Sequence, residues 1–300
     1  MSADKIDALI LAGEGKGYIP VEGLNKALID LRGRPVIEYV LQAMEGAELV
    51  GRIHLVGPLE KLGFLSAGHP RLRLFPQGRS LVENVLSSYE SICPGHDRHI
   101  LVITSDIPFV RPSEIDRFIR AALETDADIV LGLASRAAMS RFYPAEGRPG
   151  IRPACCHFRQ GAARLNNMFL VRVPAAARTE YADIIYGLRY QKRPMNFARL
   201  ILGVLGKDPG QLRLLWTLMM MQVTLQAHRL GLMPLARAWG RMVDIHDAEA
   251  AASRAAGASV KTLFMDSGGA VMDIDDKESL RAARERLGEF MSLADETPEG

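Results

Sequence analysis

The sequence has few cysteines, little net charge and no long apolar run, and each shortage argues against a class of protein. The three cysteines are too few for a disulfide framework and fit a reducing compartment. Lys and Arg number 37 against 35 Asp and Glu, without the basic excess typical of nucleic-acid binders. The longest stretch free of charge and histidine, residues 214–227, is shorter than the ~20 apolar residues that span a bilayer. The first residues also lack the pattern of a signal peptide. We therefore expect a cytoplasmic protein that binds no nucleic acid and has no transmembrane helix.

Short β-rich apolar runs alternate with helical patterns through the first 175 residues. This order is typical of a mainly parallel sheet covered by helices. Expected helices include one that opens on Pro35 and one where Ser80 and Glu83 have capping-box spacing. The expected strands span residues 8–11, 53–56, 71–75, 100–104, 128–133 and 168–173.

Long helical patterns then replace the strands until about residue 257. Strand character returns at residues 260–266 and 270–276, and a helix follows from Lys277. Because the last strands need a sheet to join, we predict an insertion in one α/β domain rather than two independent domains. The predicted parts are a core of residues 1–175 and 258–290, a helical insertion of residues 176–257 and a flexible tail of residues 291–300.

A glycine-rich segment follows the first predicted strand. Gly13, Gly15 and Gly17 alternate there, and glycine lets successive N–H groups turn toward a phosphate. The spacing matches neither the P-loop nor the dinucleotide fingerprint, so an ordinary flexible loop is an equal alternative. Lys26 could reach the same phosphates, although a solvated surface lysine is the commoner case.

The stretch "SDIPFV" places Asp106 at the end of a predicted buried strand, and Pro108 ends the strand. A buried carboxylate without a partner is costly, so Asp106 should either cap the next segment or meet a cation. Beside phosphates, Mg²⁺ is the natural cation.

The stretch "MDIDD" contains the last group of acids. Asp273 and Asp275 alternate by two and would share a face if the strand extends that far. Asp275 or Asp276 is also well placed to cap the helix that follows. We expect at least one of these acids to be structural, and Asp273 is our first choice as a ligand.

Two further pairs of neighbouring residues are weaker indications of function. Asn166 and Asn167 precede a predicted strand, where they either turn the chain or contact an acceptor. Cys155 and Cys156 lack the paired spacing of a zinc site, so we expect small buried side chains.

Taken in order, "LILAGEGKG", "NKALIDLRGRPVIEYVLQAM", "ITSDIPFV" and "MDIDDKESL" resemble the nucleotidyltransferases, most closely the MobA-like NTP transferases. The resemblance covers roughly residues 5–175 and 258–290. It implies an α/β, Rossmann-like three-layer nucleotidyltransferase fold with a mainly parallel sheet and a helical insertion.

The resemblance also implies roles for individual residues. Lys26 and Asp106 would be catalytic, and Asp106 with Asp273 or Asp275 would hold Mg²⁺, or Mn²⁺ in its place. The nucleotide would contact Leu11, Ala12, Gly13, Gly15, Lys26, Gln77, Gly78 and Ser80, the last three through its base.

This chain departs from the family pattern at the glycine loop. Glu14 stands where a glycine is usual, and the expected arginine is missing, with Lys16 and Lys26 as the nearby cations. An acid beside a triphosphate is unfavourable unless it turns outward or helps to hold metal.

The resemblance implies transfer of a nucleoside monophosphate from an NTP to a phosphorylated small molecule or cofactor precursor, with release of pyrophosphate. Positioning and charge neutralisation supply most of the rate of such a transfer. One alternative is a degenerate nucleotide-binding or regulatory protein without turnover. Another is a glycosyltransferase that uses a nucleotide sugar and a lipid acceptor.

The predicted insertion is strongly basic. Residues 189–241 contain nine Lys and Arg against one acid, Asp208, which gives +8. The same segment carries broad apolar helical patterns. Three interpretations stay open: a cap over the acceptor pocket, a contact in a homodimer, or a surface that meets anionic membranes or amphiphiles.

Overall fold

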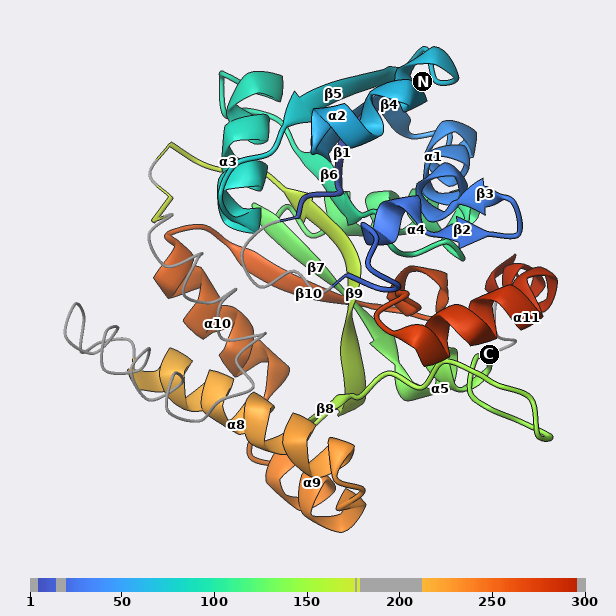
Figure 1. Ribbon diagram of the computed structural model, residues 1–300. Helices are drawn as coiled ribbons and strands as arrows, with labels where there is room; N and C mark the ends of the chain where they lie inside the picture. Colours follow the sequence, from blue (N-terminus) through green and yellow to red (C-terminus); the bar gives the residue numbers. More distant parts are fainter. Residues whose placement is uncertain (1–4, 15–19, 176, 179–211, 296–300) are drawn as a thin grey trace.

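The fold is built on a mixed sheet, and the computed structural model describes residues 5–14, 20–175, 177–178 and 212–295. The strand order is β10-β7-β9-β6-β1-β4-β5, with β8 paired to β9 (Figure 1). All strands of this path except β9 run parallel to one another. These parallel strands are β1 (Ile6–Leu11), β4 (Val50–Gly57), β5 (Leu72–Pro76), β6 (Ile100–Thr104), β7 (Ile129–Ser135) and β10 (Val260–Met265). The predicted α/β class with a mainly parallel sheet is confirmed.

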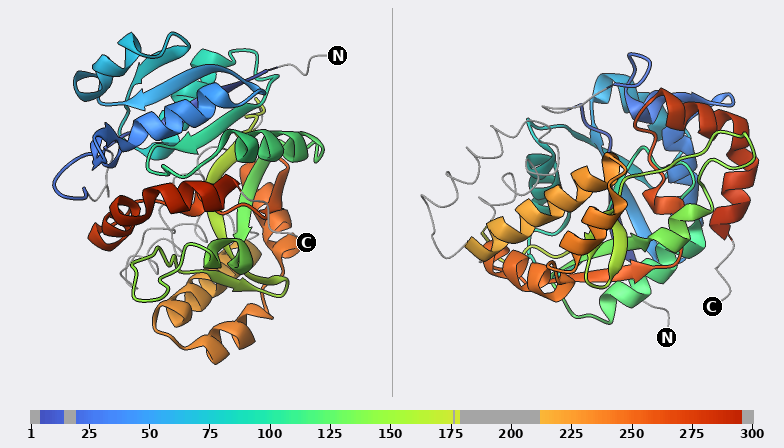
Figure 2. Two further views of the ribbon diagram at one scale, coloured as in Figure 1. Left: turned by 90° about the vertical axis from the view of Figure 1, so that its right-hand side faces the viewer. Right: turned by 90° about the horizontal axis from the view of Figure 1, so that it is seen from below.

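The sheet lies between helices on its two faces, which accounts for the continuous apolar runs of its strands. Along β1, Ala8 and Ile10 pack in the core beneath α1 (Val36–Gly46) and α4 (Pro112–Leu123). Leu9 and Leu11 alternate with them and pack on the opposite side with Tyr89 of α3 (Leu81–Ile92). The result is a three-layer arrangement of helix, sheet and helix (Figure 2).

One long antiparallel strand, β9 (Gly161–Val171), lies between β6 and β7 and also pairs with the short β8 (Cys156–Phe158). It begins before the predicted strand, so the turn predicted at Asn166 and Asn167 is wrong. Both asparagines lie inside β9, where each finds a backbone partner. Asn166 Oδ1 accepts the Met168 N–H at 3.0 Å, and Asn167 Nδ2 donates to the Ala270 carbonyl at 3.1 Å.

Three helices follow between β9 and β10 in the described part of the chain: α8 (Leu212–Arg229), α9 (Met233–Gly240) and α10 (Ile245–Ala256). Helices α8 and α9 form the end of the molecule farthest from β5 (Figures 1 and 2). No helix among the described residues is long and apolar enough to cross a membrane. The predicted division into core and insertion remains a prediction.

The C-terminal segment differs from the prediction in two ways. Residues 270–276 are not a strand and join no ladder of the sheet. They are held by the hydrogen bond from the Ile274 N–H to the Asp106 carbonyl at 2.9 Å and by side chains of β9. The last helix, α11 (Lys277–Asp295), continues past residue 290, so residues 291–295 are helical instead of tail. Asp276 accepts the Ser279 N–H at 2.8 Å and caps this helix, one of the two candidates for that role.

The remaining elements are short and lie in the connections. They are η1 (Lys26–Leu28), β2 (Asp30–Leu31), β3 (Arg34–Pro35), α2 (Leu59–Leu62), η2 (Gly63–Ala67), α5 (Arg136–Ser140) and η5 (Gly269–Val271).

Candidate active site

The candidate site lies at the carboxyl ends of β1 and β6, the edge where ligands of parallel α/β sheets bind. After β1 the chain passes through Gly13, which is closely surrounded. A Cβ at Gly13 would lie 2.9 Å from Asn84 Nδ2 and 3.3 Å from Gln77 Oε1. A larger residue would displace the Asn84 amide and crowd that of Gln77, so the side chains around Gly13 are packed for glycine.

Asn25 connects the glycine loop to Lys26. Its Nδ2 donates to the Ala12 carbonyl at 3.0 Å, and its Oδ1 accepts the Ala27 N–H at 2.9 Å as the cap of η1. Asn25 is buried and both halves of its amide are satisfied. It therefore holds the backbone of Lys26 at a set distance from the end of β1.

Lys26 lies among the three predicted metal-binding acids. Its Nζ is 3.4 Å from Asp106 Oδ2 and 2.5 Å from Asp275 Oδ1. Burial by itself would lower the pKa of Lys26, but the charges of Asp106, Asp275 and Asp273 raise it above its usual value. Lys26 therefore stays protonated and can neutralise negative charge on a bound phosphate.

Asp106 is oriented by its own strand end. Thr104 Oγ1 donates to Asp106 Oδ1 at 2.7 Å, and the Asp106 carbonyl accepts the Ile274 N–H at 2.9 Å. The next helix, α4, begins at Pro112 with Arg111 as its N-cap, so Asp106 does not cap it. The carboxylate meets a cation instead, which was the other alternative.

Asp273 is almost completely buried and pairs with an arginine that the sequence did not suggest. Arg164 of β9 contacts both carboxylate oxygens of Asp273, at 3.0 and 2.9 Å. Burial raises the pKa of Asp273 to about 6; Arg164 opposes this shift, while Asp275 and Asp106 add to it. The carboxylates are therefore close enough to disfavour one another's ionised forms.

The carboxylates of Asp106, Asp273 and Asp275 have the chemistry to bind a divalent cation, but their oxygens contact Lys26 and Arg164 in this structure. When ionised, three carboxylates against these two cations leave the group with one net negative charge. Carboxylate oxygens are the ligands that Mg²⁺ prefers. As the side chains stand, no three acids, histidines or cysteines of the described residues converge on one metal position. A metal would bind here by replacing contacts of Lys26 or Arg164.

Glu14 turns away from the loop that it interrupts. Its two carboxylate oxygens lie 2.8 and 2.7 Å from Lys61 Nζ, and its backbone N–H donates to Gln77 Oε1 at 2.8 Å. The acid is thus neutralised by a lysine that follows β4. Of the other glycine-loop residues, Gly15 and Lys16 lie outside the described residues.

The residues predicted to contact the base lie beside the glycine loop but already have protein partners. Gln77 accepts from Glu14, and the Gly78 N–H donates to Asn84 Oδ1. Ser80 Oγ accepts the Glu83 N–H at 3.1 Å and caps α3, as its spacing indicated. Their roles as base contacts stay predictions.

Three residues of the site were missed by the sequence reasoning: Asn25, Asn84 and Arg164. Asn25 had a local signal, since it directly precedes Lys26 and a cap residue is expected there. Asn84 and Arg164 had none, because their partners lie 6 or more residues away along the chain.

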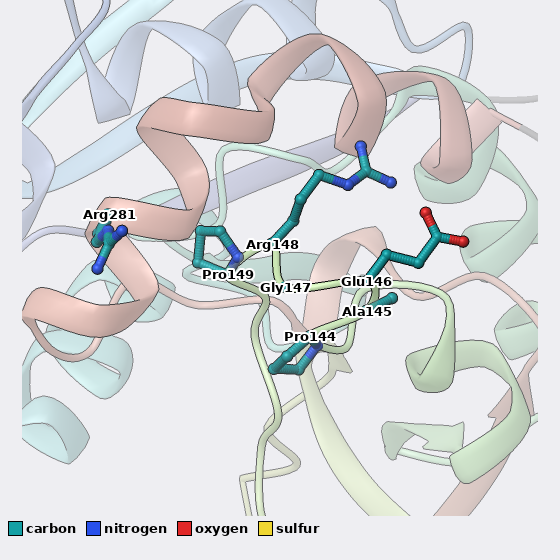
Figure 3. Close-up of a pocket in the computed structure, with 7 residues that line it drawn as sticks. All are labelled: Pro144, Ala145, Glu146, Gly147, Arg148, Pro149 and Arg281. Carbon is teal, nitrogen blue, oxygen red and sulfur yellow. The ribbon is translucent and has the colours of Figure 1, made fainter.

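Two cavities lie near these elements. One of about 250 Å³ adjoins the glycine loop, with Glu14, Asn25 and Lys61 in its lining. Another of about 390 Å³ lies between residues 144–149 and Arg281 of α11 (Figure 3). The second contains none of the predicted site residues, so its greater volume does not make it the active site.

A three-layer fold with acids and a lysine at the carboxyl edge of a mainly parallel sheet is compatible with a nucleotidyltransferase, although other classes of protein share this fold. A family model described as the MobA-like NTP transferase domain matches residues 8–197. The chain belongs to this family, and the predicted family is confirmed.

Among curated proteins, the chain is similar to 2-C-methyl-D-erythritol 4-phosphate cytidylyltransferases. It is 29% identical to the Chlorobium luteolum enzyme over 134 residues, which cover 41% of this chain and 56% of that protein. It is 30% identical to the Synechococcus sp. enzyme over 126 residues, which cover 40% of this chain and 56% of that protein. The match spans only about half the length of these relatives.

Among solved structures, the fold is similar to that of a hypothetical transferase from Thermus thermophilus. That comparison has a TM-score of 0.58 at 24% identity and covers 92% of this chain and 99% of the other. The 4-diphosphocytidyl-2C-methyl-D-erythritol synthase from Anaerococcus prevotii gives a TM-score of 0.51 at 12% identity, covering 95% and 96% of the two chains. At these identities the likeness shows the fold alone.

Proposed function

We propose that this protein is a Mg²⁺-dependent nucleotidyltransferase that transfers a nucleoside monophosphate from an NTP to a phosphorylated small molecule. The observation that carries the proposal is the position of Lys26, which contacts Asp106 and Asp275 at the carboxyl edge of the sheet. In this fold, a lysine, carboxylates and backbone N–H groups at the carboxyl edge suit charge neutralisation on a triphosphate.

Each group has a distinct role in the proposed transfer. Lys26 binds phosphate oxygens and stabilises the charge that builds up as pyrophosphate leaves. Asp106, together with Asp275 or Asp273, would hold Mg²⁺ or Mn²⁺, which neutralises phosphate charge when bound. Thr104 orients Asp106 through its 2.7 Å hydrogen bond. Leu11, Ala12, Gly13 and Gly15 would line the nucleotide site, and Gln77, Gly78 and Ser80 would contact the base.

The names of the curated relatives suggest the first substrates to test. They are cytidylyltransferases of a sugar-alcohol phosphate, so CTP is the first donor and a polyol phosphate the first acceptor class. The paired Glu14 and Lys61 remove one electrostatic objection to a triphosphate at this loop, because the negative charge of Glu14 is neutralised.

The direct test is a thermal-shift screen of the four NTPs with and without Mg²⁺, followed by pyrophosphate release with phosphorylated acceptors. A ligand at 100 times its dissociation constant stabilises the folded state by about 2.7 kcal/mol, a shift of several degrees in Tm. We expect one NTP to give a Mg²⁺-dependent shift that Asp106→Ala loses while the variant stays folded. Full activity of Asp106→Ala would remove the metal assignment.

The same screen separates the alternatives. Binding of an NTP without pyrophosphate release from any acceptor would favour a regulatory protein that retains the fold. Transfer from a nucleotide sugar would favour a glycosyltransferase. No response to any nucleotide would contradict the proposal.

We also propose that the helices of the insertion form a cap over the end of β8 and β9. The His157 N–H donates to Thr224 Oγ1 of α8 at 3.2 Å, and the Arg159 N–H donates to the Val243 carbonyl at 2.8 Å. These bonds tie the α8–α9 hairpin to the strand pair. The other basic residues between 189 and 211 lie outside the described residues.

The outer side of this hairpin suits contact with an amphiphile or an anionic membrane. Residues 212–243 contain no acid. Exposed apolar side chains there are Leu212, Trp216, Leu230, Leu232, Leu235, Trp239 and Met242. Flotation with anionic liposomes at low salt tests the contact, and sedimentation as a dimer would favour the homodimer interpretation. A cytoplasmic location goes with this proposal and is tested by cell fractionation.

A further inference from the structure

A second group of charged side chains lies beyond Arg164, around strand β8. Arg136 begins α5 directly after β7, whose last residue, Ser135, pairs with Ala163 of β9. Ala163 in turn pairs with Cys156 of β8 on its other side. The register of the three strands therefore brings the start of α5 and the start of β8 to one edge of the sheet. This is the edge that also carries Asp106.

Two histidines, one from β8 and one from α8, contact each other in this region. His157 Nε2 lies 3.0 Å from His228 Nδ1, and the two ring centroids are 5.3 Å apart. Burial, then the neighbouring His228 and the charges of Arg237 and Arg136, lower the pKa of His157. Burial and the charges of Arg136 and Arg152 lower the pKa of His228. The two rings are therefore mainly neutral at neutral pH.

The charges of three arginines from three segments of the chain act on the histidines: Arg136 of α5 on both, Arg237 of α9 on His157, and Arg152, before β8, on His228. All three are exposed, and the guanidinium of Arg152 lies over the ring of Tyr143, 5.0 Å from its centroid. We call Arg136, Arg152, Arg237, His157 and His228 the basic cluster.

The basic cluster has no compensating acid among the described residues. No salt bridge there joins Arg136, Arg152 or Arg237 to a carboxylate, although many other arginines of the protein are paired in this way. The charged groups that act on the two histidines are all basic. Such a converging and unpaired positive charge favours an anion, and guanidinium groups bind phosphate in a bidentate way.

We propose that the basic cluster binds a phosphomonoester group of the acceptor, which rests on the proposed nucleotidyl transfer. The cluster adjoins the catalytic acids through Arg164, whose charge acts on Cys155 on one side and on Asp273 on the other. An acceptor held there would lie along the same sheet edge as Lys26. Three guanidinium groups suit a dianionic phosphate better than a monoanionic carboxylate.

The phosphomonoester could belong to a soluble sugar or polyol phosphate, or to a lipid headgroup. Exposed Trp239 and Leu235, four residues apart, share one face of α9 and would suit the chains of a lipid, while Arg237, two residues from each, projects from a different face. Both sources present the same phosphate chemistry to the arginines. The experiment therefore uses one probe of each kind.

The test is calorimetric titration at low salt with inorganic phosphate and, separately, with dioctanoyl phosphatidic acid. The proteins are the wild type, the double variant Arg136→Gln and Arg152→Gln, and the control Arg52→Gln. Arg52 is an exposed arginine of β4 at the opposite end of the parallel strands. We expect the double variant to lose at least ~10-fold in affinity for whichever probe binds, and the control to match the wild type. Binding of both probes indicates a soluble acceptor, and binding of the amphiphile alone indicates a lipid.

Equal affinity in the wild type and the double variant would overturn the proposal, as would no binding of either probe. Arg136→Lys, which retains the charge without the planar fork, should give an intermediate affinity. NTP binding with Mg²⁺ is measured on the same proteins and should be unchanged by the arginine variants. If the wild type binds phosphate through these arginines but binds no NTP, the proposed function fails while the anion site stands. If NTP binds and the arginines have no effect, only the anion site fails.

Discussion

Two clusters of opposite charge lie along one edge of the sheet, and they differ in how the fold treats their charges. In the acidic cluster, formed by Asp106, Asp273 and Asp275, the carboxylates are compensated by Lys26 and Arg164. In the basic cluster the exposed arginines have no acid partner among the described residues. In the acidic cluster, cations of the protein itself neutralise the carboxylates and fix their geometry. In the basic cluster, the proposed anionic ligand would neutralise the arginines. The comparison predicts that changes in the acidic cluster affect turnover and stability, and that changes in the basic cluster affect affinity for one substrate.

The largest expected effect comes from removing the charge of Asp106. Asp106→Asn keeps the shape of the side chain but removes its negative charge, so we expect nucleotidyl transfer to fall by about 10³-fold. The measurement is kcat/KM for pyrophosphate release at saturating Mg²⁺. Asp97→Asn, at an exposed position away from the site, is the matched control and should retain wild-type activity.

Lys26→Met tests the cation of the acidic cluster. We expect about a 100-fold loss of kcat, because the amine stabilises charge that develops on the phosphates during transfer. Removing it also leaves three acids with a single cation, so Mg²⁺-free nucleotide binding should weaken further. Lys5→Met at the amino end of β1 is the control. A variant with undiminished kcat would contradict the role given to Lys26.

Arg164→Met removes the residue that joins the two clusters. Asp273 would then be buried without its cation, which should lower the free energy of unfolding by about 3 kcal/mol and raise the pKa of Asp273 above its present value of about 6. Urea denaturation measures the loss. The double variant Arg164→Met and Asp273→Leu should recover most of it, since no unpaired charge remains buried. If the double variant lost the sum of the unfolding free energies lost by the two single variants, the pair would not be coupled.

Glu114 sharpens the comparison because it is a buried carboxylate outside both clusters. Burial raises its pKa to about 7 from 4.5, with an opposing hydrogen bond from the Ala270 N–H at 3.1 Å. As pH rises, the unfolded state loses this proton first, so the folded state loses up to about 3 kcal/mol of stability between pH 4.5 and 7.

Glu114→Gln should remove this loss, because the amide cannot ionise. Unfolding curves at several pH values give the free energy of unfolding against pH for both proteins. The difference between the two slopes isolates Glu114, because the titrations of other groups cancel. Parallel curves for the two proteins would show that Glu114 titrates normally in the folded state.

The smallest effect is expected at Glu14. Its carboxylate pairs with Lys61 and points away from the glycine loop, so Glu14→Gln should change NTP affinity by less than about 3-fold. Isothermal titration with the preferred NTP measures this. If Glu14→Gln bound the NTP 10-fold or more tightly than the wild type, Glu14 would repel the triphosphate despite its pairing with Lys61.

Much of the fold follows from local pattern, and so does part of the candidate site. Strands β1, β4, β6 and β7 coincide closely with the predicted runs, because a strand buried on both faces has to be apolar throughout. Asp106 and Gly13 come two residues after the ends of such strands, so their place at the carboxyl edge follows from the sequence pattern. Ser80 was correctly identified as a cap, since its partner is 3 residues away.

The tertiary structure decided what depends on distant partners. The direction and length of β9 follow from its pairing with β6 and β7, so its asparagines belong to a strand even though their residue types favour a turn. The segment at Asp273 pairs with no strand and is held by one backbone hydrogen bond to Asp106 and by side chains of β9, so no residue periodicity predicts its conformation.

The sequence alone determined the order of the elements, the family and the residue types available at the sheet edge. Only the tertiary structure paired Arg164 with Asp273, 109 positions apart, turned Glu14 toward Lys61 and gathered the arginines of the basic cluster. The physical reason is that helix and strand periodicity depends on neighbours within a few residues. Which charges meet depends on how separate elements pack, and this information is spread over the whole chain.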